Sequence, residues 1–170
     1  MISSGFNLYT MPCFNFHVCI LILCVLEFTA ALRFTNCGPS DVELMKLDVS
    51  PCDSDRCILQ REERVTISIK FRALTNVDAG GHKVERGERI LVLLPQNGLC
   101  IHVTPSCPIK KGAEYIYSYT GRVPGTAEIG PVNIRWELLY TDGRMFLCVE
   151  FPVEIAQTAK GNTALFFSLI

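Results

Sequence analysis

Alternation of apolar and polar residues is the clearest pattern along the chain. Residues 65–71 read Val-Thr-Ile-Ser-Ile-Lys-Phe, and the same period of two recurs at 132–138 and 147–155. A period of two places every second side chain on one face, which is typical of an antiparallel strand with one buried face. Pro152 within the last run predicts an edge or a bulge, because proline cannot donate to a strand ladder.

Three further runs predict less regular strands. Residues 115–119 place three tyrosines on one face, and residues 42–49 lose their parity at Lys46, as a bulge would cause. Residues 90–94 are apolar throughout, which predicts a strand buried on both faces or one that leads into a cavity. Turn residues separate the runs at 78–81, 86–88, 96–98, 124–125 and 142–143. Six or seven short strands in about 125 residues predict an all-β sandwich.

The first 31 residues differ in composition from the rest of the chain. They contain no Lys or Arg, one acid, and nine consecutive apolar residues at 18–26. A membrane-spanning helix needs roughly 20 such residues, whereas a shorter run is typical of a signal peptide. Small residues at 29–31 predict cleavage after Ala31, with translation starting at Met1 or Met11. An uncleaved signal anchor is the less favoured alternative.

The odd number of cysteines becomes even once this leader is removed. Cys13, Cys19 and Cys24 lie in the leader, and six cysteines remain. In a secreted chain an even number indicates a disulfide framework. Spacing favours local closure for two pairs and leaves the last two cysteines to meet, which gives Cys52–Cys57, Cys100–Cys107 and Cys37–Cys148. A zinc site is disfavoured, because neither short spacing is Cys-x-x-Cys.

Charge and motifs exclude several classes of function. The part after residue 31 is formally neutral, which argues against a nucleic-acid binder. No nucleophile elbow, phosphate-binding loop or His-Glu-x-x-His motif occurs, so we expect neither an enzyme nor a cofactor. His82 lies in a Gly-rich stretch and is expected to be a solvated loop residue. His102, inside the 100–107 loop, is also expected to be exposed, with pH sensing as the alternative hypothesis.

Several motifs in order resemble one known family. They stand at 33–38, 48–52, 57–59, 107–111, 117–119, 123–124, 136–138 and 146–155. Together they resemble the ML lipid-recognition domain family. The resemblance implies the same three disulfides and an immunoglobulin-like β-sandwich of two antiparallel sheets with a lipid cavity between them. We therefore expect a signal peptide at 1–31, an ML domain at 32–156 and a disordered tail at 157–170.

A lipid cavity between the sheets requires apolar walls, because a sterol or acyl chain offers almost no hydrogen bonds. For each inward residue, ordinary core packing is the alternative. The candidate lipid-binding residues are Ile67, Ile69, Phe71, Val92, Leu93, Leu94, Tyr117, Tyr119, Val123, Gly125, Ile129, Ile134, Trp136, Val149 and Phe151.

The rim of the pocket departs from the family pattern. Where cholesterol-transferring members carry Phe, Val and Tyr, this chain has Val92 or Leu93, Gly125 and Ile129. We expect these residues to gate entry through a wider or differently shaped mouth, which places cholesterol itself in more doubt than lipid binding.

The resulting prediction is a secreted carrier that binds a sterol, fatty acid or similar lipid and hands it to a membrane or a membrane sterol receptor. It is expected to be a monomer that binds no nucleic acid. No Asn-x-Ser/Thr sequon occurs, which favours secretion over glycan-directed delivery to an endosome or lysosome. The alternatives are a secreted innate-immunity or protein-interaction module that recognises a bacterial lipid or a receptor, and a carrier of another small hydrophobe.

Overall fold

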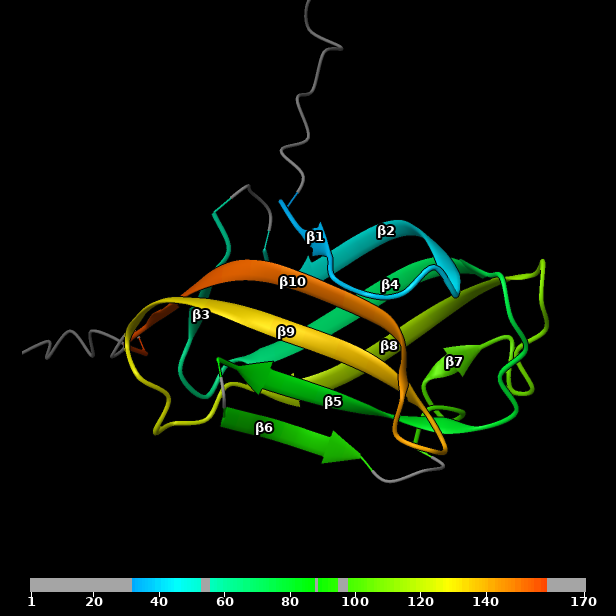
Figure 1. Ribbon diagram of the computed structural model, residues 1–170. Coiled ribbons are helices and arrows are strands. Elements are labelled where there is room, and N and C mark those ends of the chain that lie inside the picture. Colours follow the sequence, from blue (N-terminus) through cyan, green and yellow to red (C-terminus); the bar gives the residue numbers. More distant parts are fainter. Residues whose placement is uncertain (1–31, 53–55, 88, 95–97, 159–170) are drawn as a thin grey trace, which may run out of the picture.

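The computed structural model describes residues 32–158, except for 53–55, 88 and 95–97 (Figure 1). Within these ranges the chain forms strands and no helix. The strands are β1 (Thr35–Asn36), β2 (Val42–Ser50), β3 (Ile58–Gln60), β4 (Arg64–Ala73), β5 (Gly80–Arg86), β6 (Arg89–Leu94), β7 (Val103–Thr104), β8 (Glu114–Arg122), β9 (Gly130–Tyr140) and β10 (Met145–Ala156). The predicted signal peptide and most of the predicted tail lie outside the described residues.

Two sheets face each other, which confirms the predicted β-sandwich (Figure 1). The six-stranded sheet has the order β1-β10-β9-β5-β6, with β3 also paired to β10. The four-stranded sheet has the order β2-β4-β8-β7. Neighbouring strands are antiparallel, except that β3 runs parallel to β10.

The alternating runs form the long central strands. Residues 65–71, 132–138 and 147–155 lie within β4, β9 and β10. The expected slip at Lys46 is a shift of the β2–β4 register between Leu44 and Lys46. Pro152 lies on β10 between the residues that pair with β1 and those that pair with β3, so no ladder on that edge requires an N–H donor at this position.

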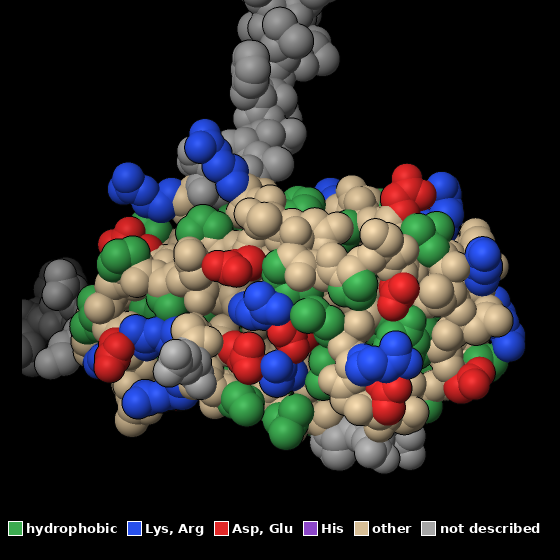
Figure 2. All heavy atoms as spheres, in the orientation of Figure 1, with side chains coloured by type: hydrophobic (Ala, Val, Ile, Leu, Met, Phe, Trp, Pro, Cys, Tyr) green, Lys and Arg blue, Asp and Glu red, His purple; other side chains and the backbone are tan. Residues whose placement is uncertain are grey.

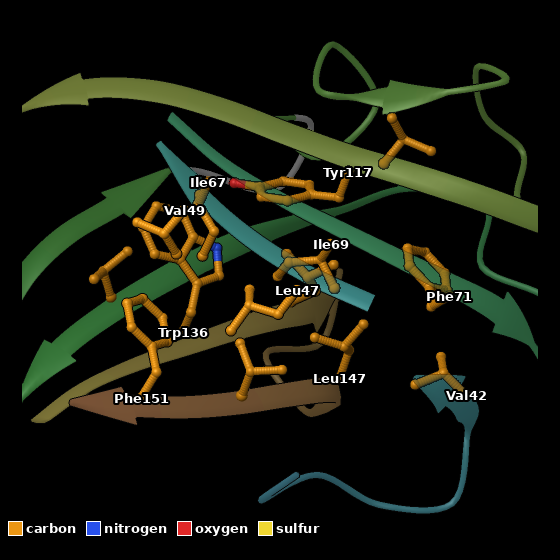
Figure 3. Close-up of a cluster of buried hydrophobic side chains, with 14 of the residues drawn as sticks. Val42, Leu47, Val49, Ile67, Ile69, Phe71, Tyr117, Trp136, Leu147 and Phe151 are labelled. Atoms are coloured by element: carbon orange, nitrogen blue, oxygen red, sulfur yellow. The ribbon is translucent and has the colours of Figure 1, made fainter. Parts of the chain in front are cut away.

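The inward faces of both sheets meet in a packed core (Figure 3). Ile69, Phe71 and Tyr117 of the four-stranded sheet are completely buried, as is Val149 of the facing sheet. Burial of each such side chain contributes about 1.5–3 kcal/mol to stability. The outward residues of the same strands are mostly polar, which is why the period of two identified the strands.

Strand β5 was missed, because residues 78–81 were interpreted as a turn. Gly80 and Gly81 instead begin a strand that lies between β9 and β6. Glycine is required here for close approach, since a Cβ on Gly80 would collide with the carbonyl oxygen of Leu139. This corrects the expectation for His82, which lies on β5 and is completely buried rather than solvated.

Three disulfides connect the six cysteines in the predicted pairs. Cys37–Cys148 joins the segment after β1 to β10 across a sequence separation of 111 residues. Cys52–Cys57 closes the connection between β2 and β3, and Cys100–Cys107 closes the loop that contains β7. The long bridge therefore holds the two ends of the domain together.

Candidate functional site

A cavity of about 430 Å³ lies between the two sheets. Its inner wall is apolar and comes from both sheets. The wall comprises Val49, Leu59, Val65, Ile67, Val84, Val132, Ile134, Trp136, Phe151, Val153 and Ile155, with Tyr119 beside them. Figure 3 shows Val49, Ile67, Trp136 and Phe151 together between the sheets. The wall thus offers an apolar ligand the same environment as the core.

The cavity opens to solvent where its lining residues are exposed. One side of this mouth is formed by Arg89, Ile90 and Leu91 of β6 and by Arg86 of β5. The other side comes from Arg122 at the end of β8 and the β8–β9 connection, with Pro124, Thr126, Ala127 and Glu128. Strand β6 pairs only with β5 among the described strands, so it is an edge strand.

The apolar run at 90–94 is therefore not buried on both faces. Ile90, Leu91 and Leu93 are 53%, 41% and 60% exposed, and the first two line the mouth. The β5–β6 register pairs Val84 with Val92 and Glu85 with Ile90, which leaves Leu91 as the extra residue of a bulge. The bulge explains why consecutive residues of β6 line the cavity. Two alternatives were open for residues 90–94, burial on both faces and a path into a cavity. The second describes the strand.

Seven of the fifteen candidate lipid-binding residues line this cavity, from both sheets and the rim. They are Ile67, Val92, Tyr119, Val123, Ile134, Trp136 and Phe151. Most of them lie on the inward faces of β4, β8, β9 and β10. The alternation of apolar and polar residues identified these faces correctly.

The other eight candidates lie elsewhere. Ile69, Phe71, Tyr117 and Val149 belong to the solid core, where the two sheets pack directly. Leu94 is half-buried on β6 but is absent from the lining. Position along the strand, rather than the inward face alone, therefore separates lining from core.

The expected gate is corrected at three of its four positions, because only Val92 lines the cavity. Leu93 lies opposite Lys83 and shares its outward face. Gly125 packs against the side chain of Glu62, and Ile129 is 57% exposed just before β9. The mouth is instead formed by Ile90, Leu91 and charged side chains.

Sequence reasoning missed Val84 and the arginines Arg86, Arg89 and Arg122 as lining residues. The local signal was weak, since Val84 is the one apolar residue among residues 82–86. The adjacent glycines concealed it, because they are typical of a turn.

Next to the cavity lies a buried cluster of aromatic side chains. The ring centroid of His82 is 4.8 Å from that of Tyr119 and 5.4 Å from that of Trp136, both of which line the cavity. His82 Nδ1 is 2.7 Å from the Tyr117 hydroxyl oxygen. Burial, with a smaller contribution from the nearby His102, lowers the pKa of His82 to about 4. Burial also raises the pKa of Tyr117 far above its usual value, so both groups are neutral at pH 7.

His102 is half-buried rather than exposed. Its ring centroid lies 5.8 Å from that of His82, and its Nδ1 lies 3.1 Å from the carbonyl oxygen of Ser118. The histidine that burial perturbs is thus His82, on the strand that the sequence did not reveal.

A second hollow lies on the outer face of the six-stranded sheet, beside Lys83, Glu137 and Arg144. Figure 2 shows acidic and basic side chains gathered on this face. Burial of Glu137 opposes its ionisation, but Lys83 and Arg135, 2.8 and 2.7 Å from its carboxylate oxygens, outweigh this and lower its pKa. This hollow is charged and suits an apolar ligand poorly.

Two kinds of feature are absent from the described part of the chain. It contains no group of three or more His, Cys, Asp or Glu side chains that could hold a metal ion. It also contains no helical segment with the length and apolarity needed to cross a bilayer.

Comparison with known proteins agrees with this architecture. The chain is 30% identical to NPC intracellular cholesterol transporter 2 homolog a of Drosophila melanogaster over 134 residues, which cover 75% of this chain and 90% of that protein. It is 29% identical to NPC intracellular cholesterol transporter 2 of Mus musculus over 143 residues, or 80% and 94% of the two chains.

A solved structure and a family model also match this chain. The crystal structure of a Niemann-Pick type C2 protein from Japanese carpenter ant matches with a TM-score of 0.61 and 25% identity, over 74% of this chain and 100% of that one. The family model of the ML domain matches residues 31–155, a range that contains both sheets, the three disulfides and the cavity. The chain therefore belongs to the ML domain family.

Proposed function

We propose that this protein is a carrier that binds a sterol, fatty acid or related lipid between its sheets and delivers it to a membrane or a membrane receptor. The observation that carries the proposal is the apolar cavity of about 430 Å³, which opens to solvent at one end. Its volume lies in the range of about 300–1,000 Å³ that is typical of ligand pockets. The relatives named as cholesterol transporters support the same function.

The physical basis of binding is removal of apolar surface from water. Each 100 Å² of ligand surface that the cavity covers contributes about 2.5 kcal/mol, and no bond has to form or break. The proposal therefore needs no catalytic group and no cofactor. Release at a membrane follows the same rule, because a bilayer accepts the ligand's apolar surface as readily as the cavity does.

We also propose that the carrier is secreted and monomeric, with an endosome or lysosome as the alternative site of action. Two features support an oxidising compartment: the leader-like composition of residues 1–31 and the three disulfides. Disulfides persist outside the reducing cytosol, so this framework suits a protein that works after export.

Trp136 provides the test, because it is the only tryptophan in the chain and it lines the cavity. The purified protein, freed of lipid by solvent extraction, is titrated with a brominated sterol and a brominated fatty acid. A ligand inside the cavity brings bromine into contact with the indole and quenches its emission. We expect saturable quenching by at least one lipid.

Two variants locate the bound lipid. Val132→Phe adds volume inside the cavity from β9 and should weaken binding at least tenfold, because the phenyl ring occupies ligand space. Ile116→Phe makes a similar change at a 43% exposed position on β8 away from the cavity, and should leave binding unchanged. Absence of saturable quenching by any lipid, or equal binding by the two variants, would refute the proposal.

A further inference from the structure

The charged residues that line the cavity are concentrated at its mouth and are mostly of one sign. They are Arg86, Arg89, Arg122 and Glu128. Figure 2 shows basic side chains beside acidic ones at the end of the molecule next to the β5–β6 and β8–β9 connections. The chain after residue 31 is formally neutral, so net charge does not account for this excess of arginine.

The strand register places two of these arginines opposite each other. Arg86 on β5 and Arg89 on β6 are direct cross-strand partners. Side chains of directly opposed residues lie on the same face, and like charges in such a pair destabilise a sheet. A negative group bound near the two guanidinium groups would relieve this repulsion.

The protein itself neutralises only part of this charge. Glu128, which is exposed, forms an ion pair with Arg86 at 2.6 Å. Arg122 donates one hydrogen bond to the carbonyl oxygen of Glu62 at 2.9 Å, and that oxygen carries no formal charge. The side chain of Arg89 is exposed and forms no ion pair or hydrogen bond with any other described residue. Arg89 and Arg122, one from each sheet, thus retain donors for a ligand.

We infer that these arginines bind the anionic head group, a carboxylate or a phosphate, of a lipid whose apolar part fills the cavity. The inference rests on the proposed carrier function and specifies its ligand class. A guanidinium group presents paired N–H donors that match both anions in a bidentate geometry. The head group then lies at the solvent-exposed mouth, while the apolar part extends toward Phe151 and Trp136 on the inner wall.

The test compares lipids that share an oleoyl or oleyl chain and differ in the head group. Oleate and oleoyl lysophosphatidic acid are the anionic probes, and oleyl alcohol and monoolein are their uncharged counterparts. Each displaces the brominated lipid that quenches Trp136 most strongly, at concentrations below micelle formation. We expect at least one anionic lipid to bind about tenfold more tightly than its uncharged counterpart, and this preference to fall as salt is raised.

A double variant assigns the preference to residues. Arg89→Gln with Arg122→Gln leaves the Arg86–Glu128 ion pair in place and should reduce the preference to less than twofold without changing the affinity for oleyl alcohol. Arg72→Gln with Arg144→Gln removes the same charge from positions away from the cavity and should retain the preference.

The possible outcomes separate this inference from the carrier function. Preference for either anion, lost in the first double variant, supports the inference and shows which head group is recognised. Equal affinity for anionic and uncharged lipids overturns it and leaves the carrier function intact. A preference that survives Arg89→Gln with Arg122→Gln, or salt-dependent binding to anionic vesicles without head-group preference in solution, also overturns it. If none of the four oleoyl or oleyl lipids displaces a brominated sterol that does bind, this inference fails and the carrier function stands. If neither brominated lipid binds, both proposals fail.

Discussion

At the scale of single residues, the buried polar cluster around His82 carries an energetic penalty. His82 Nε2 and Trp136 Nε1 are buried without a hydrogen-bond partner among the described residues. Each unsatisfied group of this kind costs about 1–3 kcal/mol. Both unsatisfied groups belong to a shell of aromatic rings beside the cavity. This shell excludes water from the imidazole of His82.

The lowered pKa of His82 predicts how stability changes with pH. The folded pKa is about 4, whereas an unfolded histidine titrates near its ordinary value of about 6.5. Between these values the unfolded chain binds the proton and the folded chain does not. The free energy of unfolding therefore decreases as pH falls from about 6.5 to 4, by about 3 kcal/mol from this group.

Urea unfolding of the protein and of His82→Phe, measured between pH 7 and pH 4, checks this prediction. The variant loses stability at all pH values, because Tyr117 loses its hydrogen-bond partner, but it should show the smaller decrease as pH falls. The same decrease in both proteins would mean that His82 titrates normally in the folded state.

At the scale of elements, strand β6 has two distinct faces although its residues 90–94 are all apolar. Val92 lines the cavity, while its neighbour Leu93 lies opposite Lys83 on the outer face. Exposed apolar side chains on an edge strand are a known aggregation hazard. On β6 such residues also form one side of the cavity mouth, so the proposed function accounts for Ile90 and Leu91 but not for Leu93.

Replacing these two neighbours tests the assignment of the faces. Val92→Asn places an amide in the lining and should weaken lipid binding about tenfold, because an apolar ligand cannot satisfy the amide's hydrogen bonds. Leu93→Asn changes an exposed side chain, so binding should change less than twofold and stability by less than about 0.5 kcal/mol. Trp136 quenching and urea unfolding measure the two quantities, and the reverse order of effects would place Leu93 in the cavity wall.

At the scale of the whole molecule, the disulfides differ in what they constrain. Cys37–Cys148 joins the first and last parts of the domain, whereas Cys52–Cys57 spans only five residues. Cross-linking a longer loop removes more conformational entropy from the unfolded chain. The long bridge restrains almost the entire domain, including β10, which contributes Phe151, Val153 and Ile155 to the cavity wall.

Removing each bridge by paired alanine substitutions should have unequal effects. Loss of Cys37–Cys148 is expected to lower the free energy of unfolding by about 5 kcal/mol, and loss of Cys52–Cys57 by about 2 kcal/mol. Urea unfolding of both double variants gives the comparison. Equal losses would show that loop length does not govern how these bridges stabilise the fold.

Much of the sandwich could be predicted, because strand periodicity is visible in neighbouring residues and the number and spacing of cysteines can be read directly from the sequence. Strand β5 could not, because its glycines have the same local chemistry in a turn and at a close contact between strands. Only the position of β9 shows that Gly80 lies against the carbonyl oxygen of Leu139. His82 was misassigned for the same reason, since its burial depends on a strand that the local pattern conceals.

The sequence by itself determined the all-β class, the inward faces of the long strands and the pairing of the cysteines. The tertiary structure alone decided which inward residues pack in the core and which face a cavity. Ile67 and Ile69 are identical in type and face, yet only Ile67 lines the cavity. The reason is physical: alternation fixes the direction of a side chain, whereas the separation of the sheets at that point fixes whether it meets another side chain or open space.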